Sequence, residues 1–224
     1  MSTVLAFDCA VSGQGVAIVR DGVSLVTLVE EGREQAARLL PAIAAALNQA
    51  GVARRELELI AVTTGPGSFT GVRVGLSAAR GLAVGLGIPL AGISTTTVLR
   101  AQAPATDRLV VAAVDTKLGD WFCAIGEEAV PFAATAGDVA ARLAGRACLI
   151  VGKDVDPLVQ SLRAAGRDAV AHDGPPDPAV LGRLAESVGV ARWRDRNGEE
   201  GLPRPLYLRG VNITLPDGAR RTVE

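Results

Sequence analysis

Two aspartates that end buried apolar runs are the residues best placed for chemistry. Asp8 follows the predicted strand Thr3–Phe7. Asp115 follows the predicted strand Leu109–Val114. In two-lobed ATP-binding folds, an aspartate in this position lies near Mg²⁺, and the turn after it holds phosphates through backbone N–H groups. The pattern raises the hypothesis of an ATP-dependent phosphotransferase or hydrolase that uses both aspartates in a cleft between two lobes.

The turns after these aspartates argue against a working ATPase. A backbone that approaches phosphates closely needs glycine. Neither 9–12 nor 116–118 contains one, and the chain has no Gly-Gly pair. We interpret the two segments as a retained scaffold with a decayed nucleotide site. Cofactor contacts of Asp8 and Asp115 stay a hypothesis.

Other catalytic patterns fail on spacing. The glycines of Gly65–Gly71 are one residue too far apart for a dinucleotide fingerprint, and no Lys-Ser or Lys-Thr follows them as in a phosphate-binding loop. Ser68 lacks the glycine two positions earlier that a nucleophile elbow requires. A peptidase would need a nucleophile beside a base, and the single histidine, His172, lies in no supporting pattern. One histidine also excludes a metal site with two His ligands from this chain.

The composition indicates a folded protein without a large charged field. Of 224 residues, 49% are hydrophobic, and the formal net charge is −1, which excludes nucleic-acid binding by phosphate neutralisation alone. The three cysteines, Cys9, Cys123 and Cys148, are not in metal spacing. We therefore expect buried, reduced thiols in a cytoplasmic protein. No targeting signal and no membrane span are expected.

The chain repeats one plan. Each half opens with a strand, an aspartate, a polar turn and a second strand, and continues with alternating helices and strands. Such alternation implies α/β layers with parallel strand pairing, to which the opening hairpins add antiparallel strands. We predict a first lobe of residues 1–103 and a second lobe of residues 104–224, whose tail from Arg194 crosses back over the body. One helix is expected over Pro178–Trp193.

The helix predicted over Val72–Leu86 is the most unusual segment. Gly75, Gly81 and Gly85 each cost about 1 kcal/mol relative to alanine in a helix interior, so we expect something to approach this helix closely. Small residues form two stripes along it. Either both stripes pack inside the protein, or one stripe docks a helix of another protein beside the preceding helix Arg33–Ala50. The spacing leaves both interpretations open.

The docking hypothesis assigns an interface to particular residues. Burial of apolar surface would drive association, and charged residues would set its register. The candidate interface comprises Arg33, Glu34, Leu40, Arg73, Gly75, Leu76, Ala79, Arg80 and Ala83. On this hypothesis, Gly75→Leu or Ala79→Leu should abolish pairing and leave the monomer folded.

Four segments resemble the TsaB family, also called YeaZ-like, a paralogue of the TsaD/Kae1 enzymes in the actin–hexokinase–Hsp70 (ASKHA) superfamily. They are Leu5–Ala10, Arg33–Pro41, Ile60–Leu86, which contains Gly-Pro-Gly-Ser-Phe-Thr-Gly, and Arg204–Arg209. The resemblance implies a two-lobed, duplicated α/β fold of the ribonuclease H-like or actin-like ATPase type, with mixed sheets flanked by helices. Gln35 stands where the family usually has histidine, which bears on the pairing surface, and Thr116-Lys117 stands where the family often has Ala-Arg.

The resemblance also implies a function. Family members help bacteria to make threonylcarbamoyladenosine next to the anticodon of tRNA. They are non-catalytic partners of a TsaD-like transferase, which a TsaE-like ATPase joins, and they pair through the two helices described above or form homodimers in isolation. The resemblance implies no cofactor or metal held by this chain alone, ATP or ADP at the interface of the complex, and indirect contact with tRNA. TsaD-type enzymes need a metal site built on His-x-x-x-His, which one histidine cannot supply.

Overall fold

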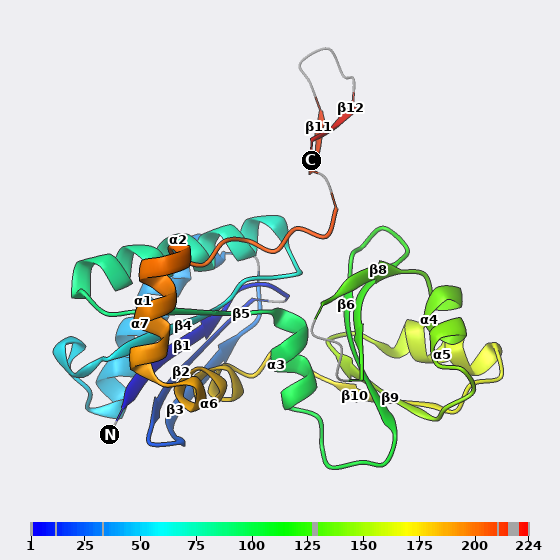
Figure 1. Ribbon diagram of the computed structural model, residues 1–224, viewed down its shortest axis with the longest axis horizontal. Helices are drawn as coiled ribbons and strands as arrows, with labels where there is room; N and C mark the ends of the chain where they lie inside the picture. Colours follow the sequence, from blue (N-terminus) through cyan, green and yellow to red (C-terminus); the bar gives the residue numbers. More distant parts are fainter. Residues whose placement is uncertain are drawn as a thin grey trace.

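The protein has two lobes, each built on a five-stranded mixed sheet (Figure 1). The computed structural model describes residues 2–11, 13–32, 34–126 and 130–209, and the backbone of 211–214 and 220–223. The first sheet has the strand order β3-β2-β1-β4-β5. Its strands are β1 Thr3–Asp8, β2 Gln14–Arg20, β3 Val23–Glu30, β4 Leu59–Thr63 and β5 Leu90–Ile93. β1 pairs antiparallel with β2 and parallel with β4.

The second sheet repeats this topology. Its order is β10-β9-β6-β7-β8. The central strand β6 pairs antiparallel with β7 and parallel with β9, as β1 pairs with β2 and β4 in the first sheet. Its strands are β6 Leu109–Asp115, β7 Trp121–Ile125, β8 Phe132–Ala134, β9 Cys148–Gly152 and β10 Ala169–Asp173. The predicted two-lobed α/β fold with mixed sheets is therefore confirmed.

Helices cover both faces of each sheet. On the first sheet, one face packs against α1 Gln35–Ala50 and α2 Phe69–Leu86, and the other against α6 Pro178–Val188 and α7 Val190–Glu200. On the second sheet, one face packs against α4 Ala136–Arg142 and α5 Asp156–Ala164, and the other against α3 Thr95–Ala101. A 3₁₀ turn, η1 Arg54–Glu56, precedes β4, and the hairpin of β11 Val211–Thr214 and β12 Arg220–Val223 lies apart from both sheets (Figure 1). Among the helices described, none is long and apolar enough to cross a membrane.

The two lobes exchange helices. α3 comes from the first half of the chain but packs on the second sheet, and α6 comes from the second half but packs on the first. The chain therefore returns to the first lobe at Pro178, upstream of the tail at Arg194. The prediction of one helix over Pro178–Trp193 is wrong, because Gly189 adopts φ 94° and ψ 141°, a backbone conformation that no helix contains. Helices α6 and α7 meet at this glycine.

The central strand β1 is covered by helices on both faces of the first sheet. Every residue of β1 is buried. Because side chains alternate along a strand, Leu5 and Phe7 pack toward α1 and α2, whereas Val4 and Ala6 pack toward α6. The first sheet is thus covered on both faces, and the outer surfaces of α1 and α2 remain available to solvent.

Candidate functional site

An open groove of about 510 Å³ lies between α1 and α2. It is lined by Ala36, Leu39, Leu40, Phe69, Thr70, Arg73, Val74, Ser77 and Ala78. Two of its large apolar side chains are exposed, Leu40 by 56% and Phe69 by 41%, and Val84, further along α2, is 73% exposed. Exposed apolar side chains that line a groove are typical of binding sites. The groove joins the two helices that the sequence analysis paired.

Helix α1 places Leu40 at the groove through its periodicity. Leu39, Ile43 and Leu47 are buried against the first sheet, and Leu40 projects from the neighbouring position. The helix begins at Gln35 and runs through Pro41. Glu34, a predicted interface residue, precedes α1 and is exposed. Its carbonyl accepts hydrogen bonds from the N–H groups of Ala37 and Arg38 at 3.0 Å. The predicted interface residue Arg33 lies outside the described residues.

The glycine-rich loop before α2 clamps this helix onto the turn after Asp8. Ser68 caps α2, because its hydroxyl accepts from the Gly71 N–H at 3.2 Å, and its own N–H donates to the Ala10 carbonyl at 2.6 Å. A Cβ at Gly67 would overlap the Ala10 carbonyl, and a Cβ at Gly71 would overlap the Cys9 carbonyl. These glycines therefore permit close packing of the loop on the turn after Asp8, inside the lobe.

The structure corrects part of the predicted interface. Gly75, Leu76, Ala79 and Ala83 are buried against the sheet of their own lobe. A partner cannot contact their side chains in this conformation, because the sheet already covers them. Their spacing matched a docking stripe equally well, since one helical period describes an inward and an outward face alike. Of the nine predicted residues, Leu40 and Arg73 line the groove.

A cationic and aromatic cluster forms one rim of the groove. The guanidinium carbon of Arg73 lies 3.7 Å from the centroid of the Phe69 ring, and its Nε–H donates to the Tyr207 hydroxyl at 2.9 Å. Arg80, another arginine of the predicted interface, donates to the carbonyl of Pro203. Sequence reasoning did not select Phe69 or Tyr207. The signal for Tyr207 was present, because it is the only tyrosine and lies in a segment with a family resemblance.

The carboxylate of Asp8 organises its own turn. It is buried, and its Oδ1 accepts hydrogen bonds from the Thr63 hydroxyl at 2.5 Å and the Ala10 N–H at 3.1 Å. Burial raises the pKa of Asp8 to about 6, against the opposing effect of these donors. The carboxylate thus supports the turn on which Gly67 and Gly71 pack.

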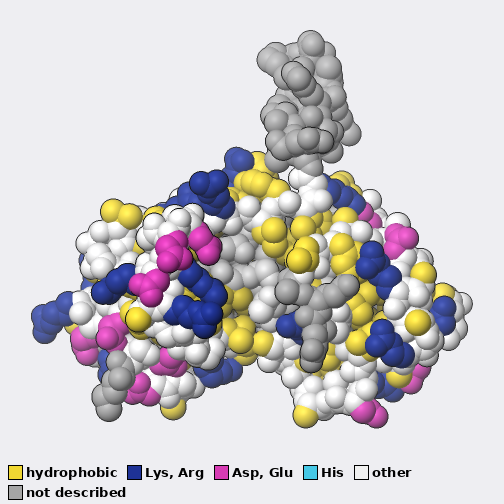
Figure 2. Space-filling model, viewed as in Figure 1, with side chains coloured by type: hydrophobic (Ala, Val, Ile, Leu, Met, Phe, Trp, Pro, Cys, Tyr) yellow, Lys and Arg dark blue, Asp and Glu magenta, His cyan; other side chains and the backbone are white. Residues whose placement is uncertain are grey.

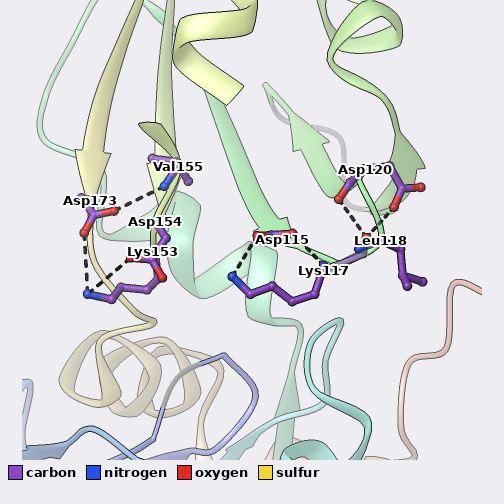
Figure 3. Close-up of polar contacts among 9 residues, drawn as sticks. Asp115, Lys117, Leu118, Asp120, Lys153, Asp154, Val155 and Asp173 are labelled. Atoms are coloured by element: carbon purple, nitrogen blue, oxygen red, sulfur yellow. Dashed lines mark hydrogen bonds and ion pairs between the residues drawn. The ribbon is translucent and has the colours of Figure 1, made fainter. Parts of the chain in front are cut away.

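The carboxylate of Asp115 is also engaged within its own lobe. It accepts hydrogen bonds from the N–H and the Nζ of Lys117 at 2.7 and 2.8 Å (Figure 3). Nearby, Lys153 lies close to Asp154 and Asp173 (Figure 3). Lys153 also pairs with Glu31 of the first lobe at 3.4 Å. Nucleotide contacts of Asp8 and Asp115 stay a prediction. Within the described ranges, no group of three His, Cys, Asp or Glu side chains could hold a metal ion.

The three cysteines are buried, as the sequence predicts. Cys9, Cys123 and Cys148 are free and buried, and burial raises the pKa of each thiol, which keeps all three neutral. His172 lies on β10.

On the face shown in Figure 2, Lys and Arg side chains are interspersed with Asp and Glu, so this face presents no continuous basic surface.

Comparison with known proteins places this geometry in a family. Residues 30–151, just over half of the chain, match the family described as TsaD, tRNA N6-adenosine threonylcarbamoyltransferase. The tRNA threonylcarbamoyladenosine biosynthesis protein TsaB of Escherichia coli (strain K12) is 34% identical over 123 residues, which are 54% of this chain and 53% of that protein. The TsaB protein of Bacillus subtilis (strain 168) is 32% identical over 118 residues, 52% of each chain. The chain spans about half the length of the curated relatives it matches.

A solved structure extends the likeness to nearly the whole chain. The crystal structure of a protein with similarity to peptidase YEAZ, from Pseudomonas aeruginosa, has a TM-score of 0.75 and 27% identity, and the match covers 93% of this chain and 100% of that one. The family match includes α1, α2 and the glycine-rich loop between β4 and α2. The chain therefore belongs to the TsaB (YeaZ-like) family, related to the TsaD transferases.

Proposed function

We propose that this chain is the TsaB-type subunit of the system that makes threonylcarbamoyladenosine in tRNA. In this role it binds a TsaD-like transferase through the groove between α1 and α2, and the transfer chemistry takes place on the partner. The observation that carries the proposal is the groove itself, an open apolar surface on helices that the family match includes. The curated relatives are described as tRNA threonylcarbamoyladenosine biosynthesis proteins.

Packing of a partner helix into the groove follows from its lining. Leu40 and Phe69 present apolar surface from the two opposing helices, and Ala78 leaves room between them. Gly81 and Gly85 continue the stripe of Ala78 along α2, and a Cβ at either would meet nothing within 4 Å. Small residues on an exposed face let a second helix approach closely. In the absence of the transferase, a second copy of this chain would occupy the same surface as a homodimer.

The chemistry of the first lobe supports a non-catalytic role. Asp8 is buried and hydrogen-bonded within its own turn, and the single histidine cannot form a His-x-x-x-His site. We therefore assign the metal and the reacting groups to the transferase. A TsaE-like ATPase would join the complex, ATP or ADP would bind at the shared interface, and tRNA would be contacted through the partner.

Leu40→Glu tests the docking surface. A carboxylate placed in the groove would lose its hydration when a partner docks, so we expect the dissociation constant for the TsaD-like transferase of the same organism to rise about 100-fold, by roughly 2.7 kcal/mol. Leu118→Glu is the matched control, because Leu118 is 73% exposed on the second lobe. Isothermal titration calorimetry measures both variants. Equal affinity of the two variants would contradict the assigned surface.

Reconstitution tests the role in tRNA modification. We expect the transferase to modify tRNA in vitro only when this chain is added, and the isolated chain to hydrolyse no ATP. The Leu40→Glu variant should fail to support modification, and Leu118→Glu should support it. ATP turnover by the isolated chain that disappears in Asp8→Asn would favour the rival hypothesis of an ATP-dependent enzyme.

A further inference from the structure

One segment with a family resemblance, Arg204–Arg209, plays no part in the function proposed above. Together with Pro203 it forms residues 203–209, here called the strap, which follows α7 and runs beside α2 toward the second lobe (Figure 1). The strap backbone is held on the first lobe, because the Leu206 N–H donates to the Thr64 carbonyl at 2.8 Å. Pro203 packs closely on Gly92, and a Cβ at Gly92 would overlap the Pro203 ring.

The strap holds two arginines of α2. Arg80 donates through Nε and Nη2 to the Pro203 carbonyl at 3.1 and 2.5 Å. Two turns earlier, Arg73 donates through Nε to the Tyr207 hydroxyl at 2.9 Å, and its guanidinium carbon lies 5.9 Å from the centroid of that ring. Phe69 stacks on the same guanidinium and lines the groove. The strap therefore contacts two residues that line the groove, Arg73 and Phe69, through Tyr207.

The far end of the strap is tied to the second lobe. Arg209 forms an ion pair with Asp120, and its guanidinium carbon lies 5.8 Å from the centroid of the Phe122 ring. Asp120 precedes β7 and also accepts a hydrogen bond from the Thr116 hydroxyl at 2.5 Å. The Asp120 carboxylate that pairs with Arg209 is therefore also held by a residue of the second lobe. The strap is fixed at both ends, with Tyr207 between them.

Fixing Arg73 has a consequence for binding. A free arginine side chain loses rotamer freedom when it binds, which weakens association, and a side chain that is already ordered avoids this loss. Within the described part of the chain, Arg73 contacts Phe69 and Tyr207 but pairs with no carboxylate. An ordered, unpaired guanidinium at the rim of an apolar groove is complementary to a carboxylate on whatever docks there.

We propose that the strap presets Arg73 to bind a carboxylate of the transferase docked in the groove. Tyr207 is the positioning residue, and the ion pair of Arg209 with Asp120 keeps the strap in place. This inference rests on the proposed function, because it requires a partner in the groove between α1 and α2. It adds an acidic residue to the description of that partner, opposite Arg73 and at the edge of its apolar surface.

A double-mutant cycle on Arg73 and Tyr207 tests the positioning. Tyr207→Phe keeps the ring and removes the hydroxyl, so we expect about fivefold weaker binding of the transferase, and Arg73→Gln should weaken it about tenfold. Because Tyr207 acts through Arg73, Tyr207→Phe should add no loss in the Arg73→Gln background. Arg142→Gln is the matched control, since Arg142 stacks on Phe132 at 3.9 Å in the second lobe, and it should leave the affinity unchanged.

A charge exchange tests the anchor. Arg209→Asp should weaken binding of the transferase, and adding Asp120→Arg should restore it by rebuilding the ion pair in reverse. Thermal unfolding of each variant verifies that it is folded. Wild-type affinity of Tyr207→Phe, an additive loss with Arg73→Gln, or no rescue by the exchange would overturn the proposal.

The controls separate this proposal from the proposed function. If Leu40→Glu abolishes binding while the strap variants bind like the wild type, only the strap proposal fails. If the wild-type chain does not bind the transferase, or Leu40→Glu binds normally, both proposals fail.

Discussion

The two faces of α2 carry small residues at similar spacing but use them differently. On the inner face, Gly71 meets the Cys9 carbonyl so closely that no Cβ fits, and Ala79 is buried against the sheet. On the outer face, Gly81 and Gly85 have open space where a Cβ would be. The inner residues are explained by the packing of this chain alone. No packing within the described part of the chain explains why Gly81 and Gly85 lack a side chain, which is the reason to test them against a partner.

The strongest way to test the inner face is Gly71→Ala. The added methyl would push the first turn of α2 away from the turn after Asp8, and overpacking against backbone should lower the free energy of unfolding by about 3 kcal/mol or more. Urea denaturation measures the loss. Gly81→Ala adds the same methyl to the outer face and serves as the control. Equal stabilities of the two variants would show that the two faces do not differ.

Asp8→Asn probes the turn on which the inner face rests. Burial raises the pKa of Asp8 from 3.8 to about 6, so the neutral carboxyl favours the folded state. The contribution of neutral Asp8 to the free energy of unfolding is complete below about pH 4 and is lost as the pH rises through 6. Because the asparagine side chain of the variant does not titrate, the variant should gain about 3 kcal/mol of unfolding free energy relative to wild type between pH 4 and pH 7. A constant difference across this range, measured by urea denaturation at each pH, would contradict the assignment.

Ala79→Leu distinguishes packing from docking on the inner face. The larger side chain has no space against the sheet, and we expect a loss of about 2 kcal/mol in unfolding free energy. This outcome differs from that of the docking hypothesis, in which Ala79→Leu abolishes pairing and leaves the monomer folded. Ser77→Leu, on the exposed side of the same turn, should change stability by less than about 0.5 kcal/mol. Chemical denaturation of both variants measures the difference, and an unchanged stability of Ala79→Leu would restore the docking interpretation.

The smallest expected effect is on the outer face. Gly81→Ala should raise the free energy of unfolding by about 0.5–1 kcal/mol, because alanine favours the helix and nothing in this chain opposes its methyl. The same holds for Gly85→Ala. A thermal unfolding series of the single and double variants measures the gain. A destabilised Gly81→Ala would mean that the outer face is covered in the folded protein.

Much of the fold could be predicted from local patterns. The predicted strands Thr3–Phe7 and Leu109–Val114 agree with β1 and β6 to within a residue, because buried apolar runs mark strands directly. It also recognised the repeated plan that the two sheets share. The exchange of α3 and α6 between the lobes was not predicted, since no local pattern states which sheet a helix will cover.

The candidate site was predicted in part. The part that Leu40 and Arg73 play in binding stays a prediction. Their position on the surface between α1 and α2 followed from the resemblance and the helical period. The burial of Gly75, Leu76, Ala79 and Ala83 did not, because a period of 3.6 residues fixes which residues share a face but not which face is covered. Tyr207 was missed because its hydrogen bond to Arg73 joins residues far apart in the chain.

The sequence alone determined most of the helices and strands, the duplicated plan and the family, because these depend on residue type and short-range spacing. The tertiary structure decided which stripe of α2 is inside, that the glycine-rich loop packs on the turn after Asp8, and that residues 203–209 hold Arg73 and Arg80. The physical reason is that burial and hydrogen-bond partners depend on contacts between distant segments.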